Sequence, residues 1–150
     1  MDCKKTTFSH DHYEETIQDY FRTKEDDDEG HHLVGTISSE ISQVIDANTN
    51  KVLISNISIN KNIKNHQDLT LDDYKKLEIL LAKNDFIIKD GEKTVGIVVH
   101  DDQLYYYALK ATATGSTIFL SSFRKTSEKD INRLRKKSGK LNCKLLKDEL

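Results

Sequence analysis

The chain has 150 residues, of which 36% are hydrophobic and 32% charged; this excludes a disordered protein and allows one domain with a buried core. Two cysteines are too few for a disulfide framework, and no apolar run approaches the roughly 20 residues of a membrane-spanning helix, so we expect a cytoplasmic protein without membrane contact. The net charge of −2 is unevenly distributed, because residues 1–30 hold ten acids and four bases whereas residues 124–150 hold four acids and ten bases. The basic end predicts an anionic partner, with nucleic acid the first candidate.

The first half of the chain has the periodicity of helices. The acidic run at residues 25–30 separates a first helix from the remainder, and the pattern from Thr70 to Asp73 is that of a capping box. Residues 1–30 are interpreted as an acidic accessory segment and residues 31–150 as a single domain. Helices are expected at residues 9–24, 38–47, about 57–65 and from residue 70, with a short strand or extended segment at residues 52–54.

The second half has the alternation of β-strands, followed by a basic helix. Strands are expected at residues 86–89, 94–100, 103–112 and 116–123. The turns between them are short enough to force antiparallel neighbours. Thr126 or Ser127 caps the basic helix, which Ile131 and Leu134 anchor. The sequence therefore predicts an α+β fold with N-terminal helices packed on a four-stranded antiparallel meander and a basic C-terminal helix.

The last two strands carry polar residues whose relative position depends on one turn. A three-residue loop at residues 113–115 pairs Lys110 with Ile118 and brings Ser122 and Arg124 to the face of Lys110. A two-residue loop would place Lys110 opposite Phe119 and turn the other two away. We predict the three-residue loop, since glycine at its last position suits the left-handed conformation needed there.

Several common chemistries are excluded by missing motifs. The chain has no glycine-rich phosphate loop, no GxSxG, no HExxH and no paired CxxC, and Cys143 has no histidine near it in sequence. We expect neither a metal nor another cofactor, because no zinc-type spacing joins the histidines beside the acidic run. Those histidines are His10, His12, His31 and His32.

His66 lies between two expected helices, where imidazole is suited to move a proton near neutral pH. Cleaving RNA without a metal requires a base for the 2′-hydroxyl, an acid for the leaving 5′-oxygen and cations for the charge on the phosphorane. His66 fits the acid or base, Lys110 and Arg124 fit an electrostatic clamp, and Ser122 fits a donor. The alternative is that His66 only makes local hydrogen bonds and that the strands form a solvated surface hairpin.

The order of these features resembles phage-associated ribonuclease-like domains grouped with barnase, EndoU, colicin nucleases and RelE, the BECR fold. The residues that carry the resemblance are 52–55, 64–74, 87–88, 107–112 and 120–124. It implies helices on a four-stranded antiparallel sheet, a metal-independent endoribonuclease, and polar site positions at His66, Lys110, Ser122 and Arg124. Gln67 stands where the family commonly has proline, and no glutamate of the expected sheet is placed to act as a barnase-like base.

Our first hypothesis is thus an endoribonuclease of toxin or phage-effector type, with RNA as the partner, tRNA among the candidates, and a cognate inhibitor protein. The alternatives are a non-catalytic nucleic-acid-binding module that uses the basic helix, or a protein-interaction domain. Residues expected to contact nucleic acid are Lys64, Lys125, Arg133, Arg135, Lys136 and Lys137.

Overall fold

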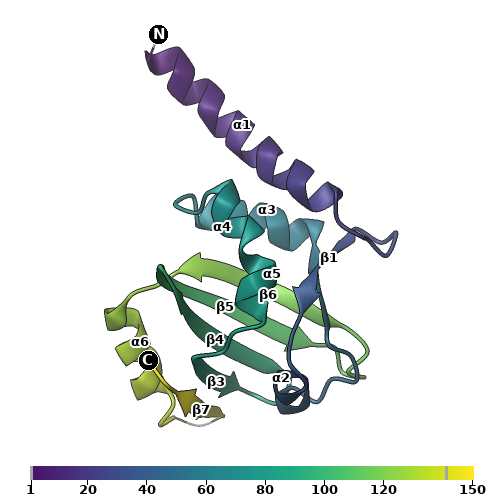
Figure 1. Cartoon of the computed structure of the whole chain (residues 1–150), viewed down its shortest axis with the longest axis vertical. Coiled ribbons are helices and arrows are strands. Elements are labelled where there is room, and N and C mark those ends of the chain that lie inside the picture. The colour runs from purple at the N-terminus through teal and green to yellow at the C-terminus, as the bar shows by residue number, and fades with distance from the viewer. Residues whose placement is uncertain (1, 141) are drawn as a thin grey trace.

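The computed structural model describes residues 2–140 and 142–150, with side chains from His12 onward. It has the mixture of helices and strands of an α+β protein, as the sequence predicts (Figure 1). The helices are α1 (Asp2–Arg22), α2 (Ser39–Val44), α3 (Asn56–Asn65), α4 (Leu71–Lys75), α5 (Leu77–Leu81) and α6 (Glu128–Lys137). The strands are β1 (His31–Thr36), β2 (Lys51–Ser55), β3 (Phe86–Asp90), β4 (Thr94–Asp101), β5 (Gln103–Ala111), β6 (Ile118–Lys125) and β7 (Cys143–Asp148). No helix in this part of the chain is long and apolar enough to cross a membrane.

The strands of the described chain form one seven-stranded sheet in the order β1-β2-β6-β5-β4-β3-β7. Its centre is the antiparallel meander of β3 to β6 that the short turns predict. The prediction of four strands is wrong, because β7 adds to β3 at one edge, while β2 pairs in parallel with β6 and carries β1 at the other. The sheet is therefore mixed, and its parallel pair joins segments more than sixty positions apart in the sequence, such as Val52 and Ile118.

The sheet separates two clusters of buried side chains. Tyr105, Tyr107 and Leu109 of β5 pack in a large core with residues of α1, α3, α4 and α5, whereas Leu104 and Tyr106 pack with a smaller cluster beneath α6. Successive residues of a strand point to opposite faces, which explains the division. Figure 1 shows α3, α4 and α5 together on one side of the sheet and α6 beside β7.

The C-terminal half of α1 belongs to the large core. Ile17 and Phe21 are 0% and 1% exposed, and Tyr13 and Tyr20 pack partly buried against the same core. The sequence pattern predicts that this helix starts at residue 9, but α1 begins earlier, at Asp2. The acidic N-terminal segment thus supplies side chains around which the remainder of the domain packs.

Side chains cap α2, α4 and α6, and the caps of α4 and α6 are those that the sequence predicts. The Ser38 side chain accepts a hydrogen bond from the Ile41 amide, and Ser127 accepts one from the Asp130 amide. Thr70 and Asp73 form a reciprocal capping box at the start of α4. Because each hydroxyl or carboxylate satisfies amides that have no partner within the helix, the sequence marks these helix starts well.

The hairpin between β5 and β6 differs from the prediction. The Thr112 amide donates to the Thr117 carbonyl at 2.9 Å, so the loop has four residues, and Lys110 lies opposite Phe119 rather than Ile118. Ser121 then forms a β-bulge, after which Ser122 lies opposite Ala108 and Arg124 opposite Tyr106. Because the bulge adds one residue to β6, the side chains after it point to the opposite face from the one that a regular strand would give them. Ser122 and Arg124 consequently share the face of Lys110, although the predicted loop is wrong.

Gly115 of this loop provides a test of the hairpin. Its φ is +75°, and a Cβ atom there would lie 2.5 Å from the carbonyl oxygen of Asp46. We expect Gly115→Ala to lower the free energy of unfolding by about 2 to 4 kcal/mol, from left-handed strain and a backbone clash. Gly91→Ala is the matched control, since Gly91 has φ +85° but no atom within 4 Å of the added Cβ. Equal losses for the two variants in urea unfolding would contradict the packing of the loop against Asp46.

Candidate functional site

The face of the sheet opposite α3, α4 and α5 has two halves. One half is covered by α6, and the other half is exposed. Ile131 and Leu134 of α6 pack with residues of β3, β4 and β7, including Phe86 and Val98. Leu33, Leu53 and Phe119 belong to neither buried cluster and are only partly buried. We call the surface formed by the residues of β1, β2, β6 and β5 on this side the open face; it comprises His31, Leu33, Lys51, Leu53, Ser55, Lys110, Phe119, Ser122 and Arg124.

Lys110 and Ser122 lie on the open face without side-chain partners among the described residues. Lys110 is exposed and faces Phe119, while Ser122 is half-buried and faces Ala108. Lys110 is four positions from Tyr106, the residue opposite Arg124, so the backbones at the two cations are separated by about 13 Å along β5. Lys110 and Arg124 thus share a face but do not sit at the same point on it.

Arg124 is held at the boundary between the open face and α6. Its Nη1 donates to Asp130 Oδ2 at 2.6 Å and to Thr126 Oγ1 at 3.4 Å. The guanidinium carbon lies 4.3 Å from the centre of the Tyr106 ring, an arrangement that favours a cation. Only part of the guanidinium is used by Asp130, which leaves N–H donors of a fixed, planar group for an anion.

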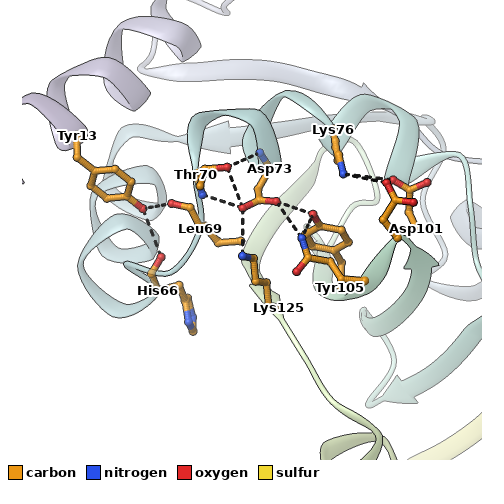
Figure 2. A network of polar contacts seen from close by, with 11 residues as sticks. Tyr13, His66, Leu69, Thr70, Asp73, Lys76, Asp101, Tyr105 and Lys125 are labelled. Atoms are coloured by element: carbon orange, nitrogen blue, oxygen red, sulfur yellow. Dashed lines mark hydrogen bonds and ion pairs between the residues drawn. The ribbon is translucent and has the colours of Figure 1, made fainter.

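His66 lies at the C-terminal end of α3, beside Arg124. Its amide donates to the Asn62 carbonyl at 2.9 Å and ends the helix, and its carbonyl accepts a hydrogen bond of 3.5 Å from the Tyr13 hydroxyl of α1. Figure 2 shows the imidazole pointing away from Tyr13, and the ring makes no hydrogen bond with a described residue. Burial lowers the pKa of His66, and the positive charge of Arg124 lowers it further, against a smaller opposing effect of Asp68. The imidazole is consequently neutral at pH 7 and able to accept a proton.

Asn62 explains how a helix end comes to lie beside the end of β6. Its Oδ1 accepts from the Phe123 amide at 2.9 Å, and its Nδ2 donates to the Tyr74 hydroxyl at 2.9 Å. The pairing of β2 with β6 stops at Phe119, so beyond that point α3 replaces β2 as the neighbour of β6. Asn62 precedes His66 by one helical turn and therefore places it next to Arg124. One of four asparagines in a polar helix gives no sequence signal for this role.

A second polar network centres on the buried carboxylate of Asp73 (Figure 2). Asp73 accepts from the Thr70 amide at 2.8 Å and from the Tyr105 hydroxyl at 2.5 Å, and Lys125 Nζ lies 3.6 Å away. Burial alone would raise the pKa of Asp73, but the hydrogen bonds from Thr70 and Tyr105 outweigh it and lower the pKa. The sequence shows the capping box but not the link to β5 and β6, because that link depends on distant residues.

Most cations expected to contact nucleic acid are engaged in ion pairs. Lys125 pairs with Asp73, Arg133 with Asp130, Arg135 with Asp148 and Lys137 with Asp90. The Arg135 pair is two-pronged, with Nε and Nη2 at 2.6 and 2.9 Å from the two carboxylate oxygens. Lys64 and Lys136 are exposed and make no ion pair with a described residue. Three of the five cations of α6 are therefore paired with acids, whereas Lys51 and Lys110 of the open face are exposed and make no ion pair with a described residue, which favours the open face over α6 as the surface for an anion.

The histidines beside the acidic run are separated in the structure. Among the described side chains, Asp27, Glu29 and His31 each offer one ligand atom within 4.8 Å of the others. His32 is buried on the opposite side of β1 and contacts Asn56, and the side chain of His10 lies outside the described residues. The His31 ring already contacts Asp27 at 2.6 Å, and this exposed acidic cluster alone gives no basis for assigning a metal.

The electrostatic interaction between His66 and Arg124 has a measurable consequence. We expect Arg124→Gln to raise the pKa of His66, because it removes a nearby positive charge that disfavours the imidazolium. Asp68→Asn should lower the pKa, because it removes a negative charge that favours the imidazolium. Titration of the His66 ring protons by NMR, in wild type and in both variants, measures both shifts. An unchanged pKa in Arg124→Gln would show that the two side chains do not interact.

Comparison of the chain with protein-family models, with curated proteins and with solved structures gives no match. The resemblance to ribonuclease-like domains therefore remains a hypothesis, and the site stands on its own geometry.

Proposed function

We propose that the protein is a metal-independent endoribonuclease whose reaction centre lies between His66 and Arg124 at the edge of the open face. One arrangement carries the proposal: the Phe123 amide of β6 donates to Asn62 Oδ1 of α3 at 2.9 Å, which holds His66, at the end of α3, close to Arg124, the residue after Phe123. Burial and the positive charge of Arg124 lower the pKa of this imidazole. A proton acceptor beside a fixed cation is the pair that attack on a phosphodiester requires.

In this reaction His66 removes the proton from a ribose 2′-hydroxyl, and the oxygen attacks the adjacent phosphorus. Arg124 donates hydrogen bonds to the phosphorane oxygens, and the Ser122 hydroxyl, two residues before it on the same face, is a further donor. The bond to the 5′-oxygen breaks, and that oxygen takes a proton from solvent, which reaches the open face. The products are a 2′,3′-cyclic phosphate and a free 5′-hydroxyl, and no metal or redox step is involved.

Lys110 has a different role from the clamp predicted from the sequence. Its backbone lies about 13 Å along β5 from the residue opposite Arg124, so the two cations suit different phosphates of one strand. Lys64, two residues before His66 and exposed, suits a third. In this proposal an RNA strand follows β5 and β6, with the cleaved bond at the His66 end.

The second candidate is a nucleic-acid-binding module without catalysis. The same face serves it, because Lys51 and Lys110, which make no ion pair with a described residue, flank a partly exposed aromatic ring. The paired cations of α6 make that helix a weaker candidate for the binding surface than the sequence indicates.

Incubation of the purified protein with total RNA, with and without a chelator, tests the proposal. We expect cleavage that a chelator does not affect, fragments ending in 2′,3′-cyclic phosphate, and no cleavage of a strand that lacks the 2′-hydroxyl at the scissile position. Binding without cleavage supports the second candidate. Cleavage that requires a divalent ion contradicts the mechanism.

A further inference from the structure

Phe119 occupies an unusual position for an aromatic side chain. Its neighbours along β6, Ile118 and Leu120, are 0% and 1% exposed in the large core, but Phe119 points to the open face and belongs to neither core cluster. The His31 ring meets it edge to face, with the ring centres 4.9 Å apart. Leu53 lies beside it in the parallel pair with β2. Phe119 is thus fixed in orientation by its neighbours while part of its ring stays accessible.

Unpaired cations lie on both sides of this ring. Lys110 is directly opposite Phe119 on β5, and Lys51 lies on β2, two positions before Leu53. Both are exposed and make no ion pair with a described residue, whereas Lys93, in the turn before β4, pairs with Asp46 at 3.3 Å. Asp27 and Glu29 lie near His31 at the β1 side, where Asp27 contacts the His31 ring at 2.6 Å. The accessible charge around Phe119 on β2 and β5 is positive.

An aromatic ring between ammonium groups on a sheet surface matches the chemistry of single-stranded nucleic acid. Bases stack on the ring whatever their identity, because every base has a flat π-face, and the flanking phosphates contact the lysines. A base-paired duplex hides its base faces and cannot use the ring in this way. The ring and its cations therefore select an unpaired strand.

We propose that Phe119 and Lys110 form a subsite of the open face that stacks an unpaired RNA base and holds its adjacent phosphate. The inference rests on the proposed function, since it supplies the substrate class: a single-stranded region a few nucleotides from the cleaved bond. Ser122 lies between this subsite and Arg124 on the same face, so one strand passes continuously over all three positions. Lys110 anchors substrate here and takes no part in proton transfer.

The test measures binding separately from cleavage. A short fluorescein-labelled RNA with 2′-O-methyl groups throughout cannot undergo 2′-hydroxyl attack, and its anisotropy reports affinity alone. We expect Phe119→Ala to weaken binding by about tenfold and Phe119→Trp to retain it, as loss and preservation of a stacking surface require. Lys110→Gln should weaken binding and lower the dependence of log affinity on log salt by about one unit. Lys75→Gln, an exposed lysine of α4 away from the open face, is the charge control.

Several outcomes overturn the subsite. Binding by Phe119→Ala that equals wild type, in a variant whose melting temperature shows a folded protein, rejects it. Equal affinity for a duplex of the same sequence also rejects it. A concentration-dependent dimer that Phe119→Ala abolishes, together with no RNA binding by wild type, assigns the face to a second copy of the chain instead. Binding that depends on Phe119 with no cleavage of native RNA leaves the subsite standing and rejects the nuclease.

Discussion

Replacing His66 by Gln is expected to lower the rate of RNA cleavage by about 10²- to 10⁴-fold, the usual contribution of a positioned general base. Glutamine keeps a polar side chain at the end of α3, and the contacts of Asn62 and Tyr13 use backbone groups of residue 66, so the fold should be unaffected. His100→Gln is the matched control, because His100 is exposed at the end of β4. Both variants should melt like wild type and bind the uncleavable RNA with similar affinity.

The dependence of cleavage on pH distinguishes a base from a residue that only binds. A general base is active when deprotonated, so the rate should rise with pH through the pKa of His66 and level off above it. Because burial and Arg124 lower this pKa from its ordinary value of 6.5, the rise should lie below pH 6.5. A rate that is the same for His66→Gln and wild type across this range rejects His66 as the base.

Replacing Asp73 by Ala is expected to lower the free energy of unfolding by about 3 to 5 kcal/mol, the usual loss when one partner of a buried charged network is removed. The Tyr105 hydroxyl and the Thr70 amide would lose their acceptor, and Lys125 would lose its counter-ion. Asp72→Ala is the control, since the neighbouring Asp72 is exposed. Urea unfolding at pH 7 measures both, and a loss below about 1 kcal/mol for Asp73→Ala would contradict the buried network.

The same variant has a defined response to acid. The pKa of Asp73 is lower in the folded protein than its ordinary value of 3.8, so its contribution to stability is present above about pH 4 and is lost as pH falls through the folded value. The stability difference between wild type and Asp73→Ala should therefore narrow as pH falls below 4. A difference that widens in acid would show that the folded protein holds Asp73 protonated.

The fold could be predicted where local signals act alone. The strands of the meander alternate in hydrophobicity and are joined by short turns, and Ser38, Thr70 and Ser127 mark helix starts by their hydrogen-bonding groups. The strands at the two edges of the sheet could not be predicted. The strand β1 begins with two histidines after an acidic run, and β7 is a polar segment that becomes a strand by pairing with β3. The parallel pairing of β2 with β6 joins distant residues and leaves no periodic trace.

For a similar reason, only part of the candidate site could be predicted from the sequence. The alternation of the strands indicates that Lys110, Ser122 and Arg124 could lie on one face of the sheet. Their shared face depends on the bulge at Ser121, however, and no local pattern indicates that bulge. The place of His66 beside Arg124 depends on Asn62, whose partners Phe123 and Tyr74 come from other elements. Phe119 has the pattern of an ordinary strand residue until the pairing shows which face it occupies.

If RNA lies along the open face from Phe119 to His66, titration of the protein with the uncleavable single strand should shift the amide NMR signals of that face. We predict shifts confined to β5, β6 and the loop after α3, with the exposed side of α6 unchanged. Shifts centred on α6, or none at saturating RNA, would show that RNA does not lie along the open face.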